Sequence, residues 1–355
     1  MRIAIIVITL CICQIALAQS TAGPQDSYVC PPCNSSCDTV VHDKPGVCNH
    51  CAMELIKKGT VNLPKDNNST KRIAFYLQDG VEVLDFAGPM EVFSYAGFEV
   101  FTVSKTKDSI KSQGILNIIP DYDLSDAPKA DIMAFFGGNA SRASQDKEVI
   151  DWVQQQTGID YYFSVCTGAF ILAEAGILDN KTATTFHSAL NDLENNYPAI
   201  NVLKDTRYVD NGTIITTAGI SAGIDGALHL VAKIKGFNNA RKVAYDIEYD
   251  KWTPGEGRLL IDENPYDYFK RVSNLKDYVG TYEFKDSQKV VIAYSERENS
   301  IYAILDGQNY PLFYLADHSF QSLNGQHITF ERDAHHTVTG YRSDEDTSIL
   351  YKKLK

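Results

Sequence analysis

The stretch "YFSVCTGAFILAEAGIL", residues 162–178, joins an apolar run directly to a helical pattern. "DYYFSV" (160–165) predicts a buried strand, and "AFILAEAGIL" predicts the helix that follows it without a loop. Cys166 stands at the corner, as in a nucleophile elbow, where a sharp strand-to-helix turn forces the side chain up. The helix N-terminus carries partial positive charge, which is expected to lower the pKa of this thiol. We interpret Cys166 as functional; the alternative is a small buried hydrophobic residue.

Strands and helices alternate on both sides of this corner. "RIAFYLQ" (72–78) and "FEVFTVSK" (98–105) predict strands, "ADIMAFFGG" (130–138) a buried strand and "KEVIDWVQQQT" (147–157) a helix. The alternation predicts an α/β domain, with a mostly parallel sheet and helices on both of its faces. Sites in such sheets form outside the carboxyl ends of the strands, which is where Cys166 falls.

Other polar or glycine positions are candidates for the same site. Gly137 and Gly138 end a different strand, where their N–H groups could face a developing oxyanion. Asp85 lies in the apolar context "VLDFAG", so burial is expected to raise its pKa and suit it to proton transfer near neutral pH. The alternative is that Asp85 caps a helix or satisfies loop amides. Glu91 is either a pocket group or a first-turn carboxylate, and His187, after a short strand, is a minor candidate.

The mature part of the chain has a cysteine cluster near its N-terminus. The spacings Cys30-x-x-Cys33 and Cys48-x-x-Cys51 can place four thiolates around one tetrahedral metal ion. Residues 28–56 are too few for a hydrophobic core, so metal binding would supply much of the folding free energy. Disulfides are the alternative, because exported proteins meet oxidising compartments. Further potential ligands are Cys37, His42 and His50.

The N-terminal residues and the overall charge restrict where the protein works. Residues 1–18 combine Arg2, an apolar stretch and a small-x-small end, which predicts a cleaved signal peptide and a periplasmic or secreted protein. No later segment is long and apolar enough to span a membrane. The net charge of -12 disfavours nucleic acid as a partner.

The remaining segments complete the domain organisation. Residues 57–71 are polar and rich in Asn, which indicates a linker, and 252–273 form a connector. From 274 to 355, short alternating strands with Asn, Asp and Gly turns predict an antiparallel sandwich or small barrel. His335 and His336 fall at one of its turns, which favours a solvated turn.

Residues 72–251 resemble the DJ/PfpI branch of the class I glutamine-amidotransferase-like superfamily. Within it they are similar to the isocyanide hydratase subgroup and to the ligand domains of AraC-type regulators. The resemblance implies a flavodoxin-like fold and, because members are often dimers, a homodimer. It rests on the motifs "VLDFAGPMEVF" (83–93), "FFGG" (135–138), "VCTGAFILAEAGIL" (165–178), "ATTFHSAL" (183–190), "TTAGISAGIDGALHLV" (216–231) and "VAYDIEYD" (243–250).

The resemblance also implies a reaction. The nucleophile of the family falls on Cys166, the residue beside it on Thr167, and the acid/base carboxylate on Asp85. The implied chemistry is addition of the thiolate to a small electrophile, such as hydration of an isocyanide to an N-substituted formamide, with no cofactor at the α/β site. Peptidase-like members of the superfamily have His where this chain has Thr167, so a Cys–His pair from adjacent residues is excluded.

The flanking segments resemble two further families. Residues 28–56 are similar to the heavy-metal-binding domain found beside bacterial efflux components, through Tyr28, Cys30-Pro31, Asp43-Lys44-Pro45-Gly46, Cys48, Cys51, Met53 and Leu55. Cys33 stands where that family usually has His, and the loop after it is longer. The thiolate-rich set favours zinc or copper(I). Residues 274–355 resemble the lipocalin-like barrel appended to many exported β-lactamase-like proteins.

Two non-catalytic functions compete with the enzyme hypothesis. A ligand-sensing domain joined to a metal module would act in envelope metal or stress handling. A redox sensor would instead use oxidation of Cys166 to sulfenic acid.

Overall fold

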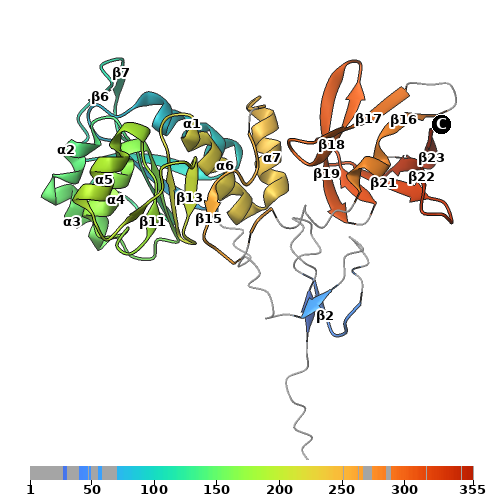
Figure 1. Ribbon diagram of the computed structural model, residues 1–355, viewed down its shortest axis with the longest axis horizontal. Coiled ribbons are helices and arrows are strands. Elements are labelled where there is room, and N and C mark those ends of the chain that lie inside the picture. Colours follow the sequence, from blue (N-terminus) through green and yellow to red (C-terminus); the bar gives the residue numbers. More distant parts are fainter. Residues whose placement is uncertain are drawn as a thin grey trace, which may run out of the picture.

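The computed structural model shows an α/β unit, a β-barrel and a small N-terminal sheet (Figure 1). Within the described part of the chain, no helix has the length and apolar character needed to cross a bilayer. The structure describes residues 27–29, 40–46, 48, 55–57, 70–250, 252–262, 264–266, 274–284, 289–316, 318–344 and 346–354.

An eight-stranded sheet forms the centre of the α/β unit. All neighbouring strands run parallel except β13 and β14, so the prediction of a mostly parallel sheet is confirmed. In spatial order the strands are β15 (Arg258–Leu259), β13 (Tyr208–Asp210), β14 (Ile214–Thr217), β10 (Tyr161–Val165), β9 (Ile132–Phe135), β4 (Arg72–Tyr76), β5 (Glu99–Ser104) and β8 (Tyr122–Asp123).

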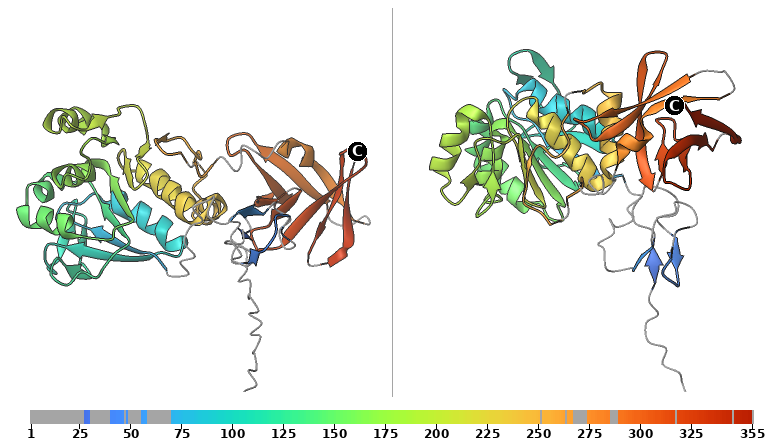
Figure 2. Two further views of the ribbon diagram at one scale, coloured as in Figure 1. Left: turned by 90° about the horizontal axis from the view of Figure 1, so that it is seen from below. Right: turned by 45° about the vertical axis from the view of Figure 1, so that its right-hand side comes forward.

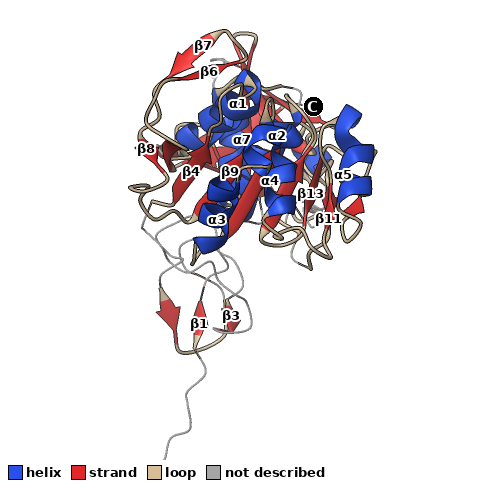
Figure 3. Cartoon of the chain, turned by 90° about the vertical axis from the view of Figure 1, so that its left-hand side faces the viewer, coloured by secondary structure: helices blue, strands red, loops and turns tan. Residues whose placement is uncertain are grey.

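Helices cover both faces of this sheet (Figure 3). Successive strand residues point to opposite faces, and the central strands are apolar on both. Phe75 therefore packs in the core cluster on one side and Tyr76 in the cluster on the other. One face carries α1 (Val83–Tyr95), α6 (Ala222–Lys235) and α7 (Phe237–Asp246); the other carries α2 (Ala140–Ser144), α3 (Lys147–Gln155), α4 (Ala169–Glu174) and α5 (Leu190–Asn196).

Part of the expected connector belongs to the α/β unit. Strand β15 extends the main sheet by pairing with β13, and Trp252 and Tyr266 are buried in the core beside α6 and α7. The apolar and aromatic side chains in this segment explain the difference, because burying them against the helices removes their surface from water. Two small sheets lie outside the main one: β6 (Ile110–Ser112) with β7 (Leu116–Ile118), and β11 (Thr182–Ala183) with β12 (Asn201–Val202).

The C-terminal strands close into an antiparallel barrel, which decides between the two predicted forms. Its first and last strands pair at Tyr282 and Lys353, so the barrel has no free edge. Aromatic side chains including Phe320 and Phe330 fill the interior. The strands are β16 (Gly280–Glu283), β17 (Lys289–Ser295), β18 (Ser300–Leu305), β19 (Gln308–Ala316), β20 (Ser319–Gln321), β21 (His327–Arg332), β22 (Val338–Ser343) and β23 (Asp346–Lys353), preceded by the 3-10 helix η4 (Leu275–Tyr278).

The barrel contacts the α/β unit through α7 (Figure 2). Asn238 Nδ2 donates to the carbonyl of Tyr314 at 3.0 Å, and Arg241 Nη1 donates to the carbonyl of Leu312 at 3.3 Å. Both acceptors are backbone groups of β19. Two side chains of one helix therefore attach the barrel wall to the α/β unit.

Near the N-terminus, three two-residue strands form a small antiparallel sheet. They are β1 (Tyr28–Val29), β2 (Val41–His42) and β3 (Ile56–Lys57). Cys48 is buried. The predicted signal peptide and the other predicted metal ligands, Cys30, Cys33, Cys37 and Cys51, lie outside the described residues.

Candidate active site

Cys166 occupies the corner between β10 and the short 3-10 helix η2 (Cys166–Gly168), which leads into α4. Its φ of 59° is a left-handed conformation that costs energy for a residue with a Cβ. Hydrogen bonds hold it there: Cys166 N–H donates to the Ala218 carbonyl at 3.1 Å, and Thr185 Oγ1 donates to the Cys166 carbonyl at 2.6 Å. The geometry is that of the expected elbow, and only 5% of the residue is exposed.

The carboxyl group of Asp85 lies fully buried beside this thiol. Asp85 is in the first turn of α1, where Oδ2 accepts from Gly137 N–H and Oδ1 accepts from Ile220 N–H, both at 2.9 Å. The Cys166 thiol lies close enough to this carboxyl group to affect its pKa. Asp85 therefore satisfies loop amides, as the alternative interpretation expected, and contacts the candidate nucleophile as well.

Gly137 is the residue that lets the acid and the thiol meet. A Cβ at Gly137 would lie 2.6 Å from Asp85 Oδ2 and 2.7 Å from Cys166 Sγ, so any side chain there would occupy the space that they share. The expected role of the Gly137 N–H as an oxyanion donor is not met, because this N–H is bonded to Asp85. Gly138 has a φ of 88° and forms a bridge with Val81, which gives it a role in the turn.

The two acidic groups compete for one proton. Burial, then the negative charge of Asp85, raises the pKa of Cys166 to about 12, although the backbone N–H and hydroxyl of Thr167 oppose the shift. Burial raises the pKa of Asp85 to about 6, against the hydrogen bonds from Ile220, Gly137 and Cys166. The expected depression of the thiol pKa is therefore wrong for this arrangement: burial and the adjacent carboxylate outweigh the helix N-terminus. Near neutral pH the proton stays on sulfur.

Thr167, next to the nucleophile, has an unused hydroxyl. Its Oγ1 is buried and makes no hydrogen bond of normal geometry within the described residues, although it lies near enough to the thiol to influence its pKa. A buried hydroxyl without a partner is unusual, because such a group loses its hydrogen bonds to water. It is therefore available to a bound substrate.

Two predicted site residues lie elsewhere. Glu91 is in the third turn of α1 with an exposed side chain, so it is neither a pocket group nor a first-turn carboxylate; Asp85 holds the first-turn position. His187 begins the 3-10 helix η3 (His187–Ala189), is exposed and packs edge-on against Phe186 at 4.2 Å between ring centroids. No contact between His187 and Cys166 occurs among the described residues.

A second buried ionic cluster lies elsewhere in the domain. Asp210 Oδ2 lies 2.8 Å from His229 Nε2, and Lys233 Nζ donates to both Asp210 oxygens at 2.9 Å. The other ring nitrogen of His229 lies 2.8 Å from the Tyr266 hydroxyl. Asp225, which shares the helix with His229, instead pairs with Arg207. The cluster links β13, α6 and the segment around Tyr266.

Sequence reasoning missed the backbone donor at Ile220 and the hydroxyl of Thr185. Ile220 has a φ of 57° in the loop before α6, which aims its N–H at Asp85. The signal available was "TTAGISAG" (216–223), a strand that ends in a glycine-flanked loop ahead of a helix. Nothing in the sequence alone distinguishes Thr185 from its neighbour Thr184.

A strained cysteine elbow beside a buried carboxyl, at the carboxyl ends of a mostly parallel sheet, defines a class of α/β proteins with a cysteine at the site. The DJ-1/PfpI family matches residues 71–233. A curated relative is 36% identical to this chain, and the alignment covers 78% of that relative. The protein belongs to the DJ-1/PfpI family.

The relatives include both enzymes and regulators. The chain is 36% identical over 181 residues to isonitrile hydratase of Pseudomonas putida, covering 50% of this chain. It is 26% identical over 182 residues to an HTH-type transcriptional regulator of Pseudomonas aeruginosa, covering 49% of each chain. A crystal structure of a THiJ/PfpI family protein from Pseudomonas syringae aligns at 26% identity and a TM-score of 0.48, covering 56% of this chain and 86% of that one.

Proposed function

We propose that the protein hydrates an isocyanide, or a related small electrophile, at Cys166. The observation that carries the proposal is the direct contact of the Cys166 thiol with a buried carboxyl of raised pKa. A carboxyl with a pKa of about 6 exchanges protons readily near neutral pH, as acid/base catalysis requires. The 36% identity to an isonitrile hydratase supports the choice of substrate class.

In the proposed reaction the S–H bond adds across the terminal carbon of the isocyanide. Sulfur forms a bond to this carbon while the thiol proton passes through Asp85 to the same carbon, which gives a thioimidate. Water then adds to the carbon, the C–S bond breaks and sulfur recovers a proton. The products are an N-substituted formamide and the original thiol, so one water is consumed and no oxidant is needed. In this proposal the Thr167 hydroxyl, which lies beside the thiol, binds the substrate or the water.

Replacement of the nucleophile tests this proposal. Cys166→Ala is expected to abolish formamide production from cyclohexyl isocyanide, followed by proton NMR. Cys48→Ala removes a buried thiol outside the α/β unit and should retain turnover. Full activity of Cys166→Ala would refute the proposed role of this thiol.

A second candidate function is ligand binding without catalysis. The similarity to a transcriptional regulator over the α/β unit favours it, because a related domain occurs in a protein named for regulation. The discriminating measurement is calorimetry of wild-type protein with isocyanides. Heat of binding without formamide would favour this function over the enzyme.

We also propose that residues 1–18 export the protein and that residues 28–56 bind zinc or copper(I). The donor set is four thiolates from Cys30, Cys33, Cys48 and Cys51, with Cys37 as a further ligand. Two observations support the fit: Cys48 is buried, and His42 Nε2 is buried without a hydrogen-bond partner among the described residues. Thiolates and imidazole suit these ions.

Metal titration and fractionation test this second proposal. Full-length protein should bind about one ion of zinc or copper(I), counted by mass spectrometry under native conditions. Cys48→Ser should weaken binding, whereas Cys166→Ser should not. Export predicts that cell fractionation recovers a chain shortened by the signal peptide. Disulfide-linked Cys48 in the isolated protein would contradict the metal assignment.

A further inference from the structure

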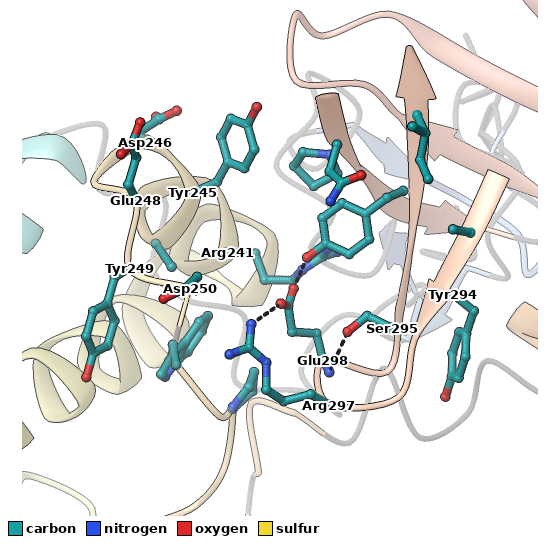
Figure 4. A pocket seen from close by; sticks show the side chains of 18 residues that line it. Arg241, Tyr245, Asp246, Glu248, Tyr249, Asp250, Tyr294, Ser295, Arg297 and Glu298 are labelled. Carbon is teal, nitrogen blue, oxygen red and sulfur yellow. Dashed lines mark hydrogen bonds and ion pairs between the residues drawn. The ribbon is translucent and has the colours of Figure 1, made fainter. Parts of the chain in front are cut away.

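A cleft of about 870 Å³ lies between α7, the segment that follows it and the barrel (Figure 4). Its walls come on one side from α7 and the segment after it (Glu248, Tyr249, Asp250, Trp252 and Pro254), and on the other from β17, β18, β19 and the turn between β17 and β18. None of the residues placed at the Cys166 site lines it. This volume falls within the range of small-molecule sites, which often form at domain interfaces.

The barrel side of the cleft holds a buried cation that lacks a full set of partners. Arg241 reaches from α7 toward the barrel and is 4% exposed. Its Nη1 donates to the Leu312 carbonyl, but its Nη2 has no hydrogen-bond partner within the described residues. Burial lowers the pKa of Arg241, a sign that its charge is poorly solvated. Leaving a buried guanidinium donor unpaired is costly, so an anionic acceptor would stabilise it.

Glu298 and Tyr302 stabilise the Arg241 charge in part, but neither forms a hydrogen bond with Nη2. Glu298 accepts from Arg297 at 2.8 Å and from the hydroxyl of Tyr302. A second unpartnered donor lines the same cleft, because Trp252 is 4% exposed and its indole N–H has no acceptor among the described residues. Guanidinium and indole nitrogens donate only, so their complement is a group with acceptor oxygens, such as a carboxylate.

The rim of the cleft carries acidic side chains, in contrast to the donors inside. Asp246 and Glu248 are exposed carboxylates at the end of α7, and Tyr245 and Tyr249 also line the cleft. A simple anion would be repelled by this rim, whereas an ammonium group would be attracted to the carboxylates and could lie against the aromatic rings. The cleft thus offers donors inside and acidic groups outside.

We propose that this cleft binds a zwitterionic small molecule, an amino acid or short peptide, with its carboxylate on Arg241 and Trp252 and its ammonium group at the acidic rim. The interior of the cleft supplies two donors for the carboxylate, beside a Glu298 that is already paired with Arg297 and Tyr302, and the rim supplies the counter-charge for the amine. The site is independent of the proposed chemistry at Cys166.

Tryptophan fluorescence provides a direct test. The chain has two tryptophans, and Trp152→Phe leaves Trp252 as the one reporter, inside the cleft. Full-length Trp152→Phe protein is titrated with the twenty amino acids and a set of dipeptides, and then with their amino-acetylated and carboxyl-amidated forms. Zwitterions should change the emission saturably. Either modification should weaken binding by roughly tenfold or more, the scale of a lost hydrogen bond to a charged group.

Variants separate the two ends of the ligand. Asp246→Asn with Glu248→Gln should weaken zwitterions but spare the amino-acetylated forms, whereas Arg241→Met should weaken both. Because Arg241 also attaches the barrel, the rim variant remains decisive if Arg241→Met fails to fold. Asp192→Asn, an exposed carboxylate on α5, is the matched control and should change nothing. The proposal is overturned if no zwitterion alters Trp252 emission at millimolar concentration, or if plain carboxylic acids bind equally well.

Discussion

Two carboxylates in the same α/β unit, Asp85 and Asp210, are both fully buried, yet their pKa values move in opposite directions. Burial favours the protonated form of each. Asp210 overcomes it with His229 and the charge of Lys233, which together hold its pKa below the usual value. Asp85 has backbone amides and a thiol as partners, and no ion pair with it occurs within residues 70–250, so its pKa rises to about 6.

The contrast separates Asp210, a carboxylate in a structural ion pair, from Asp85, a carboxylate that can exchange a proton. A carboxylate with a cationic partner keeps its charge and fastens three segments together. A carboxylate that has only neutral donors retains a proton that can be exchanged, at a cost in stability above its pKa. The difference lies in the neighbours: a histidine and a lysine beside Asp210, and backbone amides and a cysteine beside Asp85.

The largest expected effect, on formamide turnover, comes from removing the charge of Asp85. Asp85→Asn should lower formamide turnover by about 10² to 10⁴-fold, the usual contribution of a general acid or base. Removing the negative charge should also lower the pKa of Cys166, so alkylation of the thiol by iodoacetamide at neutral pH should accelerate. Turnover and alkylation are measured on the same protein. A parallel fall in both would indicate a disturbed fold rather than a lost proton shuttle.

Breaking the ion pair between Lys233 and Asp210 should instead lower the free energy of unfolding. Lys233→Met leaves the buried Asp210 without its cation and should cost about 3 to 5 kcal/mol in the free energy of unfolding, measured with urea. Thiol alkylation in the folded state should stay unchanged. Lys242→Met, at an exposed position on α7, is the control and should change stability by no more than about 0.5 kcal/mol.

The pH dependence of stability should distinguish the two regions. The raised pKa of Asp85 gives stability that is complete below 3.8 and lost as pH rises through about 6, a loss of about 3 kcal/mol. His229, whose pKa burial lowers, acts in the opposite sense: stability is lost as pH falls below 6.5. Asp85→Asn should therefore remove the loss of stability that occurs as the pH is raised. His229→Gln should remove the gain in stability that accompanies a rise in pH toward 6.5. Urea unfolding across this range measures both; unchanged pH profiles would refute the assigned shifts.

The smallest effects belong to the two candidates that lie away from the thiol. Glu91→Gln and His187→Ala should each change turnover less than about twofold, because both side chains are exposed and surface substitutions are usually tolerated. Steady-state kinetics with the isocyanide substrate checks this. A drop comparable with that of Asp85→Asn would restore either residue to the site.

The α/β fold could be predicted from sequence because its signals are local. Buried strands such as Ile132–Phe135 are apolar on both faces, and the helices between them have their own period. The C-terminal sequence left two forms open, a sandwich and a barrel, because alternating strands do not reveal whether the first strand pairs with the last. Strand β15 was missed because two residues of strand pattern, Arg258–Leu259, carry too little periodicity.

The site was predictable to the level of residue types but not of contacts. The corner at Cys166 and the apolar setting of Asp85 are both visible in short motifs. The assignment of the Gly137 N–H to Asp85 depends on residues 52 positions apart, and that of Ile220 on residues 135 apart. The pKa of the thiol is raised by burial and by the charge of Asp85, which belongs to a distant part of the chain, and this is why a local argument from the helix N-terminus failed.

Because the barrel closes on itself, its first and last strands lie next to each other, and the barrel can be moved as a unit. Leu354 N–H donates to the Thr281 carbonyl at 2.8 Å, so the chain enters and leaves the barrel at one point. A segment whose ends coincide can be excised or grafted between two residues of a host loop without stretching either. Protein engineers could thus transplant residues 274–354 as a unit.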